Sequence, residues 1–369
     1  MYFDERPKDN KKSLYNREEE LSKLVNELRK GAPLILLLGL RRVGKTSLLY
    51  TALNESKQPS ILVDCREFEE HFAVSYRNFL GVLERSVSKL IGKYDGLRRY
   101  LKRIKGVTLG SFGVQFSFED KPQSSIIALL NQLNSWGSDQ GYKVVLALDE
   151  AQELRKVRGL NIQSILAYTY DRLRNIVTVL TGSQVGMLHR FLQVENPKTP
   201  LYGRSVVEIA VRRLNDHDAL DFLMKGFDQL GVKANTDMLD YCVQRLDGIP
   251  GWLTSFGARA VREGVKKEVV DRVLETGSHL VADELKRFLV ARGIAERRYR
   301  LILRRLAEEP ASWTQLKIFL EAKEGKRISP SIFTQLLNNF VDSGFVEKSN
   351  ETYRIPDPIL LYGIKAGLV

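Results

Sequence analysis

Short apolar runs and segments of helical spacing alternate along the first part of the chain. Each apolar run has the length of one strand and is nearly continuous, which is typical of parallel strands covered on both faces. The runs fall at residues 34–38, 60–65, 143–148 and 176–183, and a strand-like segment follows at 205–209. Helical periodicity occupies residues 16–29, 47–53, 71–92, 123–136 and 163–174. This order predicts an α/β fold around a parallel sheet.

Three segments depart from this alternation. Residues 1–13 are polar and charged, and we expect them to form an extended arm. A basic stretch at 98–105 precedes alternating apolar positions at 107–118, which indicate a hairpin, so we assign residues 96–122 to an insertion on the main sheet. Residues 137–141 are expected to form a loop.

From residue 215 onward the periodicity is helical, with a break at residues 246–253. We predict a small helical lid there. Three further helices, around 298–307, 312–321 and 329–343, precede a short hairpin, and this is the order of a winged helix. The predicted domains are an α/β core at 1–212, a lid at 213–284 and a winged-helix domain at 285–369.

Composition and charge limit the number of domains, the class of partner and the cellular compartment. The 369 residues suffice for two or three domains, and a net charge of +12 with a pI near 9.5 permits an anionic partner such as nucleic acid. Residues 285–327 hold twelve Lys or Arg against five Asp or Glu. Two distant cysteines, Cys65 and Cys242, indicate a reducing compartment. Because the start is polar and no apolar run reaches the length of a membrane span, we expect a cytoplasmic protein with no membrane partner.

The turn after the first apolar run carries the pattern Gly-x-x-x-x-Gly-Lys-Thr, formed by Gly39, Gly44, Lys45 and Thr46. Glycines let such a loop curl so that its backbone N–H groups point at one phosphate chain. Lys45 would reach the β- and γ-phosphates, and the Thr46 hydroxyl would coordinate Mg²⁺. An accidental glycine-rich turn is the alternative, but the buried strand directly before the loop is the context that a P-loop requires. The expected nucleotide contacts are Gly39, Arg41, Arg42, Val43, Gly44, Lys45, Thr46 and Ser47.

A second chemical landmark ends the apolar run at 143–148, where Asp149 and Glu150 follow directly. In open α/β sheets, ligands bind at the carboxyl ends of the strands. Asp149 suits a direct or indirect Mg²⁺ contact, and Glu150 suits orientation and deprotonation of an attacking water. A strand that ends at a helix N-terminus is the alternative. The P-loop favours the catalytic interpretation.

Two weaker candidates follow. The strand at 176–183 should lie beside the first strand, so Thr181 or Ser183 is a candidate γ-phosphate sensor, although both residue types commonly end strands. Arg204 lies in a turn at 200–204 and is a candidate for transition-state stabilisation, although most arginines of this kind are surface residues.

Together these elements resemble the archaeal ATPase family within the AAA+ and STAND group of P-loop NTPases. The resemblance covers nearly the whole chain and is carried by residues 16–21, 39–46, 148–150, 200–204 and 248–250. The P-loop and the Asp-Glu pair are common to the superfamily. Three further elements single out the family: Arg17-Glu18, the turn with Gly203-Arg204, and Gly248-Ile249-Pro250 of the lid.

The resemblance implies ATP binding and hydrolysis coupled to domain movement, with ATP or ADP and Mg²⁺ at the site. In the family, the motif that contains Arg17 lies against the adenine and usually begins with Gly, where this chain has Asn16. We expect Asn16 to cap the first helix. Pro250 would contact the nucleotide from the lid, and Arg204 would serve as a phosphate sensor or finger. The lid has no clear second-sensor arginine, which fits a switch better than a ring-forming motor.

Three functions stay open at this point. The favoured one is an ATP-dependent switch that repositions the winged helix. In the second, the helix at 329–339 reads DNA through Ser329, Ser331, Thr334, Gln335, Asn338 and Asn339, although winged helices also serve purely as protein-contact modules. The third is a non-catalytic scaffold that holds ADP. Glu150 disfavours the scaffold, because a scaffold has no use for a water-activating acid at that position.

Overall fold

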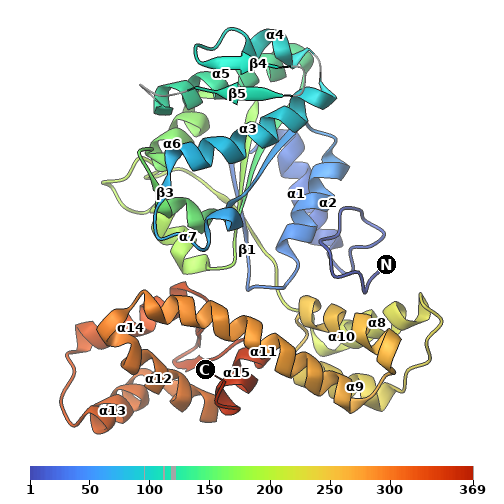
Figure 1. Cartoon of the computed structure of the whole chain (residues 1–369), viewed down its shortest axis with the longest axis vertical. Coiled ribbons are helices and arrows are strands. Elements are labelled where there is room, and N and C mark those ends of the chain that lie inside the picture. Colours follow the sequence, from blue (N-terminus) through green and yellow to red (C-terminus); the bar gives the residue numbers. More distant parts are fainter. Residues whose placement is uncertain (95, 111–112, 118–121, 369) are drawn as a thin grey trace.

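A five-stranded parallel sheet forms the centre of the N-terminal part of the chain, as the apolar runs predict (Figure 1). The computed structural model describes residues 1–94, 96–110, 113–117 and 122–368. The sheet order is β2-β6-β8-β1-β9, formed by β2 (Ser60–Asp64), β6 (Val144–Asp149), β8 (Ile176–Gly182), β1 (Leu34–Leu38) and β9 (Val207–Ala210). All neighbouring strands are parallel, so the carboxyl ends of β1, β6 and β8 share one edge.

The side chains of β1 alternate between two hydrophobic layers. Ile35 and Leu37 join a cluster with the helices of one face, whereas Leu34 and Leu36 join a cluster with the helices of the other. The first face carries α1 (Glu18–Lys30) and α2 (Lys45–Ser56), and the second carries α3 (Tyr76–Lys93), α5 (Pro122–Gln140), α6 (Ile162–Arg172) and α7 (Val185–Leu192). Short elements between them are η1 (Cys65–Phe68), β3 (Val74–Ser75), η2 (Ala151–Lys156) and β7 (Val157–Arg158). Burial on both faces explains why the central strands are apolar throughout.

The prediction of a loop at 137–141 is wrong for most of that range, because α5 continues to Gln140. Gly137 lies inside the helix rather than at its end. A Cβ at this position would lie 3.0 Å from the carbonyl oxygen of Tyr142, so the glycine allows a close backbone approach. Such a contact depends on tertiary structure, and the sequence alone gives no sign of it.

The expected insertion contains α4 (Leu97–Leu101) and a hairpin of β4 (Val107–Leu109) and β5 (Val114–Phe116). The hairpin prediction is confirmed for these strands, whereas Phe118 lies outside the described residues. Figure 1 shows α4 and the hairpin at the end of the core opposite the C-terminal helices. The insertion is therefore remote from the carboxyl edge of the sheet.

The prediction of an extended arm at residues 1–13 is wrong. Phe3 is only 6% exposed and belongs to the hydrophobic core of the helical lid. Farther along, the backbone N–H of Lys8 donates to Ser47 Oγ at 3.0 Å. The segment therefore crosses from the lid to α2. Two aromatic residues, Tyr2 and Phe3, override the polar character of the rest of the segment.

The predicted lid consists of α8 (Asp216–Asp228), α9 (Thr236–Leu246), α10 (Pro250–Glu263) and α11 (Lys267–Val290). The break predicted at 246–253 is a tight turn at 247–249, in which Gly248 has φ 63° and a Cβ would lie 2.1 Å from the carbonyl oxygen of Leu214. The proposed boundary between residues 284 and 285 falls inside α11, so this helix continues from the lid into the C-terminal part.

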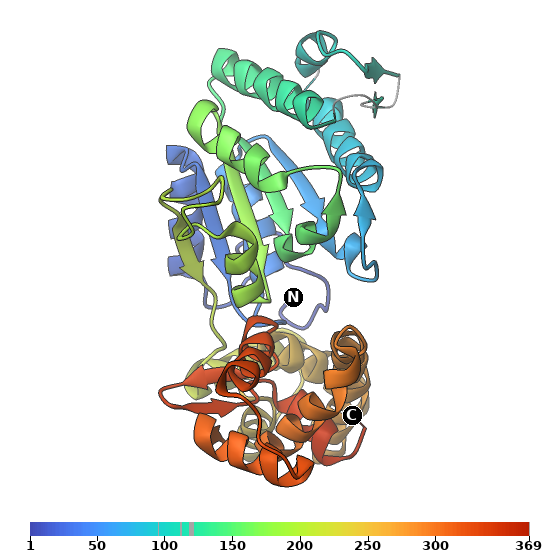
Figure 2. The same cartoon turned by 90° about the vertical axis from the view of Figure 1, so that its left-hand side faces the viewer.

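The last part of the chain confirms the predicted order of three helices and a hairpin. It contains η3 (Gly293–Ala295), α12 (Glu296–Glu308), β10 (Ala311–Ser312), α13 (Trp313–Glu324), α14 (Pro330–Asp342), β11 (Glu347–Ser349), β12 (Thr352–Arg354) and α15 (Pro358–Lys365). The three strands form one antiparallel sheet. The sequence did not predict α15, which packs against α11. Figure 2 shows the lid and these elements gathered beneath the sheet. No helix among the described residues is long and apolar enough to span a membrane.

Candidate functional site

The loop between β1 and α2 wraps around the N-terminus of α2, and its two glycines have different roles. Gly44 adopts φ 100°, which other residues rarely adopt, directly before α2 begins at Lys45. Gly39 is required for packing, because a Cβ there would lie 2.2 Å from the carbonyl oxygen of Val211. The loop therefore brings backbone N–H groups and the positive end of α2 to one place, which is a site for an anion.

The Lys45 ammonium lies in the curl of this loop and is 4% exposed. Its Nζ donates to the carbonyl oxygen of Leu40 at 2.8 Å and lies 4.0 Å from Glu150 Oε1. Burial lowers the pKa of Lys45, whereas the carboxylates of Glu150 and Asp149 oppose that shift. A phosphate oxygen could take the place of the Leu40 carbonyl as the partner of this cation.

Thr46 and Asp149 meet at the carboxyl end of β6. Thr46 Oγ1 donates to Asp149 Oδ2 at 2.9 Å, and Thr181 Oγ1 donates to the other carboxylate oxygen. Burial raises the pKa of Asp149, and the two hydroxyl hydrogen bonds oppose the shift. One hydroxyl and one carboxylate at a sheet edge are hard oxygen donors of the kind that Mg²⁺ prefers. The donor set therefore fits magnesium.

The backbone and three hydrogen bonds fix the position of the Glu150 carboxylate. Glu150 has φ 52°, a left-handed conformation that is strained for a residue with a Cβ. Its Oε2 accepts hydrogen bonds from the Ser183 hydroxyl at 2.6 Å, the Ser183 N–H at 3.1 Å and the Gln152 amide at 2.7 Å. Burial opposes ionisation, but the Lys45 ammonium and these hydrogen bonds outweigh it and lower the pKa of Glu150. The carboxylate is therefore kept ionised, as a base toward water must be.

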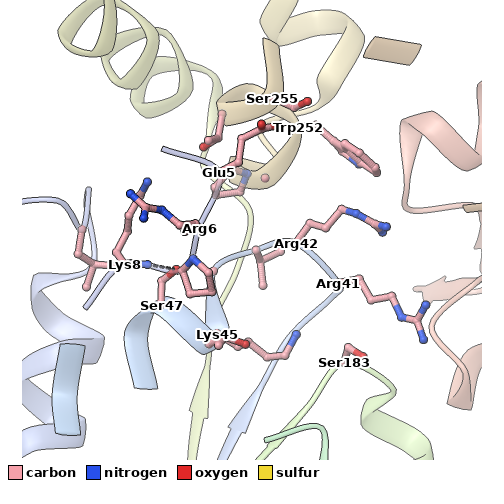
Figure 3. Close-up of a pocket in the computed structure, with 18 of the residues that line it drawn as sticks. Glu5, Arg6, Lys8, Arg41, Arg42, Lys45, Ser47, Ser183, Trp252 and Ser255 are labelled. Carbon is pink, nitrogen blue, oxygen red and sulfur yellow. Dashed lines mark hydrogen bonds between the residues drawn. The ribbon is translucent and has the colours of Figure 1, made fainter. Parts of the chain in front are cut away.

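These groups lie at one end of a cavity of about 510 Å³ between the core and the lid (Figure 3). Among the residues predicted to bind nucleotide, those on its walls are Arg17, Arg41, Arg42, Val43, Gly44, Lys45, Thr46, Ser47, Glu150, Ser183 and Pro250. Gly39 and Asp149 do not line the cavity, and Asp149 lies behind the wall, fully buried and hydrogen-bonded to Thr46. The volume suits a small molecule such as a nucleotide.

Arg17 lines the cavity, but its guanidinium donates hydrogen bonds to backbone carbonyls rather than pointing to free space in the cavity. Nη2 donates to the carbonyl oxygen of Arg212 at 2.6 Å and to that of Val43 at 3.4 Å. Asn16 has φ 47°, a conformation that Gly and Asn adopt most readily, which explains how Asn16 replaces the Gly of the family motif. The prediction that Asn16 caps the first helix is wrong, since α1 begins at Glu18 with Arg17 in the capping position.

The structure does not bring Arg204 to the cavity. Its Nε and Nη2 donate to the two carboxylate oxygens of Asp171 at 3.0 and 2.6 Å, and its guanidinium lies near the Tyr170 ring. Both partners belong to α6, on the sheet face opposite α2. Among the described residues of this chain, Arg204 is therefore a structural side chain, and its predicted phosphate contact finds no support.

Apart from Pro250, the sequence reasoning missed the second wall of the cavity, which comes from the N-terminal segment, α10 and α11. Figure 3 shows Lys8 of the N-terminal segment bonded to Ser47, with Trp252 of α10 facing the same space. No motif marks these residues. Aromatic residues in an otherwise polar start were the available signal for the N-terminal segment. Gln152 was also missed, although it stands two positions after Glu150.

Comparison with known proteins agrees with this geometry. Residues 14–256 match the family model of an ATPase domain predominantly from Archaea, and residues 293–356 match that of the MCM protein C-terminal winged helix-turn-helix domain. No curated protein matches the chain.

Among solved structures, the chain is similar to the Walker-type ATPase of Pyrococcus abyssi, with 32% identity over 99% of this chain and 100% of that chain and a TM-score of 0.82. It is also similar to the ORC2 protein of Aeropyrum pernix, solved in ADPNP and ADP complexes, with 14% identity over 100% of this chain and 96% of that chain and a TM-score of 0.61. The second likeness concerns the fold alone.

Proposed function

Because the chain belongs to the family of ATPase domains found predominantly in Archaea, we propose that it binds and hydrolyses ATP with Mg²⁺ and that its nucleotide state controls the lid and the winged helix. The observation that carries this proposal is the convergence of Lys45, Thr46 and Glu150 on one end of the cavity. A site that only stored ADP would not need an ionised acid at that end.

Phosphoryl transfer depends on positioning and charge stabilisation. We assign the phosphates to the N–H groups of the loop and to the Lys45 ammonium. Glu150 accepts a proton from the attacking water and directs its oxygen at the γ-phosphorus. The bond between that phosphorus and the β–γ bridging oxygen breaks, so that ADP and phosphate leave. Ser183 and Gln152 hold the Glu150 carboxylate in place through their hydrogen bonds.

Thr46 and Asp149 would hold the magnesium ion, whose charge offsets that of the β- and γ-phosphates. Asp149 sits behind the wall, where burial disfavours an uncompensated carboxylate, so a cation beside it would relieve that penalty. Turnover should therefore be lost on chelation of divalent ions and return when Mg²⁺ is added.

Contacts between the lid and the phosphate loop support the switch. The Gly251 N–H donates to the carbonyl oxygen of Arg42 at 2.9 Å, and the Arg42 guanidinium lies 4.3 Å from the centre of the Trp252 ring. Pro250 begins α10 at this contact. A change in the loop on nucleotide exchange would therefore shift α10. We propose residues 1–212, 213–284 and 285–369 as the moving units, joined through α11.

The test is ATP turnover by the full chain and by Lys45→Ala. We expect turnover in the wild type and loss of both binding and turnover in the variant. Lys30→Ala, which removes an exposed lysine from the end of α1, is the control and should behave like the wild type. Full turnover in Lys45→Ala would refute the proposal. Bound ADP without any turnover by the wild type would favour the scaffold.

The C-terminal part supports DNA binding as a second candidate function. The exposed side of α14 presents Ser331, Thr334, Gln335 and Asn338, whose side chains can bond base edges. Thr334 already accepts from the Trp313 indole at 3.1 Å, and Asn339 donates to the Tyr299 hydroxyl at 2.9 Å. Exposed cations for phosphate contacts are Arg297, Arg304, Lys326 and Arg327. Fluorescence anisotropy with duplex DNA should show affinity that falls steeply with salt. Salt-independent binding, or none, would favour a protein-contact module.

A further inference from the structure

Two arginines at the variable positions of the phosphate loop share one carboxylate of α11. Arg41 Nη1 pairs with Glu284 Oε2, and Arg42 Nη2 pairs with Glu284 Oε1 at 2.9 Å. Arg41 Nη2 also lies 3.4 Å from Oε1 of Glu69, which follows η1. The side chains are mostly buried, with 25% of Arg41, 23% of Arg42 and 15% of Glu284 exposed. Partly desolvated pairs of this kind are stronger than exposed ones.

Arg42 is committed to the lid. Its backbone is left-handed with φ 64°, its carbonyl oxygen accepts the Gly251 N–H, and its guanidinium stacks on Trp252. A residue held through its backbone and through its guanidinium, which also pairs with Glu284, is not available to follow the nucleotide. Arg42 therefore belongs to the joint between the loop and the lid.

Arg41 differs because its charge acts on the end of the cavity that holds Glu150. It lines the same cavity as Lys45, Glu150 and Ser183, and Figure 3 shows its side chain on the Ser183 side of the loop. Its charge also contributes to the lowered pKa of Glu150. The Arg41 guanidinium thus pairs with the Glu284 carboxylate, while its charge acts on Glu150 at the end of the site assigned to the γ-phosphate.

We propose that Arg41 determines the preference of this site for a triphosphate over a diphosphate, and that Glu284 competes with the γ-phosphate for its guanidinium. The inference rests on the proposed ATP binding and adds a specificity residue to it. A guanidinium forms paired hydrogen bonds with a carboxylate or with a phosphate, and it cannot satisfy both in full.

This competition joins the nucleotide to the C-terminal part of the chain. Glu284 lies on α11, which begins in the lid and ends directly before the winged helix. Thermodynamic linkage makes this competition reciprocal. If the Arg41–Glu284 ion pair lowers the affinity for a triphosphate, then a bound triphosphate weakens the ion pair by the same free energy. The γ-phosphate therefore loosens the hold of the loop on α11, whereas ADP leaves it in place.

The experiment measures dissociation constants for ADP and for a non-hydrolysable ATP analogue by calorimetry, in Mg²⁺, on the full chain. Arg41→Ala should weaken the analogue about tenfold and ADP less than about twofold. Glu284→Gln, which keeps the shape and removes the charge, should tighten the analogue about fivefold and leave ADP unchanged. Asp283→Asn removes the same charge at an exposed neighbouring position and should change neither.

The double variant Arg41→Ala with Glu284→Gln separates Arg41 from Arg42. The gain from Glu284→Gln should vanish when Arg41 is absent. Persistence of that gain would show that Glu284 acts through Arg42, and equal weakening of ADP and analogue by Arg41→Ala would show a merely structural role. Either result overturns the proposal while ATP binding stands. A wild type that binds neither nucleotide refutes both this inference and the proposed function.

Discussion

The two walls of the cavity are built in opposite ways. The phosphate wall comes from the carboxyl edge of one sheet, where residues 41–47, 150, 152 and 183 stand on the segments that follow β1, β6 and β8. The facing wall comes from the N-terminal segment, the start of α10 and α11. The strands hold the first wall through continuous hydrogen bonding, whereas side-chain contacts and separate hydrogen bonds, such as that from the Gly251 N–H to the Arg42 carbonyl, join the second wall to the first. Under the proposed function we assign the chemistry to the first wall, called the rigid wall, and the response to nucleotide to the second, called the movable wall.

Glu150→Gln is expected to have the largest effect, and it separates the role of the rigid wall in turnover from nucleotide binding. The amide keeps the shape of the side chain but cannot accept a proton from water, so we expect the turnover rate to fall about a hundredfold or more. Nucleotide affinity should stay within a few-fold of the wild type, because the loop and Lys45 are untouched. Single-turnover hydrolysis and ADP binding measure the two quantities separately.

Gln152→Ala is the matched comparison on the same wall. It removes one of the three hydrogen bonds to the Glu150 carboxylate and should reduce turnover far less than Glu150→Gln. Turnover by Glu150→Gln close to the wild-type rate would mean that the base lies elsewhere and that the rigid wall does not contain the chemistry.

In the facing wall, Phe3→Ala should lower the stability of the lid. Phe3 fills a space kept open by Gly226 and Gly257, where a Cβ would lie within 2.4 Å of the ring. Truncation should destabilise the lid by about 3 kcal/mol, because a large apolar side chain leaves a cavity. Hydrogen exchange in α8 and α10 should increase, and nucleotide affinity should fall, while the turnover rate at saturating ATP stays near the wild-type value.

Phe72→Ala provides the control for Phe3→Ala, since Phe72 is 81% exposed and its truncation should leave lid exchange unchanged. Unaltered exchange in Phe3→Ala would show that the N-terminal segment is not part of the movable wall. A fall in saturated turnover would show instead that the segment takes part in the chemistry.

Substitution of Asn16, which precedes Arg17 at the cavity, should have a smaller effect on stability. Its φ of 47° is strained for alanine, so Asn16→Ala should destabilise the chain by about 1 kcal/mol, whereas Asn16→Gly should be nearly neutral. Urea unfolding of the two variants measures the difference. Equal midpoints would mean that the left-handed conformation of Asn16 is unimportant for holding Arg17 against the loop.

The contrast between the walls also explains what could be predicted from the sequence. The strands and the phosphate loop follow from local patterns, since apolar runs, a glycine turn and two acids each lie within a few residues. The confirmed winged helix likewise follows from the order of its helices and hairpin. The position of Phe3, the length of α5 past Gly137 and the pairing of Glu284 with the loop arise from contacts between distant segments. Local periodicity contains no information about such contacts.

Substitution of Arg204 should have the smallest effect on stability and turnover, because Arg204 belongs to neither wall. Its bidentate contact with Asp171 lies at the surface, with 21% of the Arg204 side chain and 45% of the Asp171 side chain exposed. Arg204→Ala should therefore change stability by less than about 1 kcal/mol and leave turnover in dilute solution within about twofold of the wild type. Asp171→Asn should match it, because both variants weaken the same pair. Turnover measured across a range of protein concentrations decides the question. A large loss in Arg204→Ala alone, growing with concentration, would mean that Arg204 reaches the phosphates of a neighbouring molecule, and the division into two walls of one chain would then be incomplete.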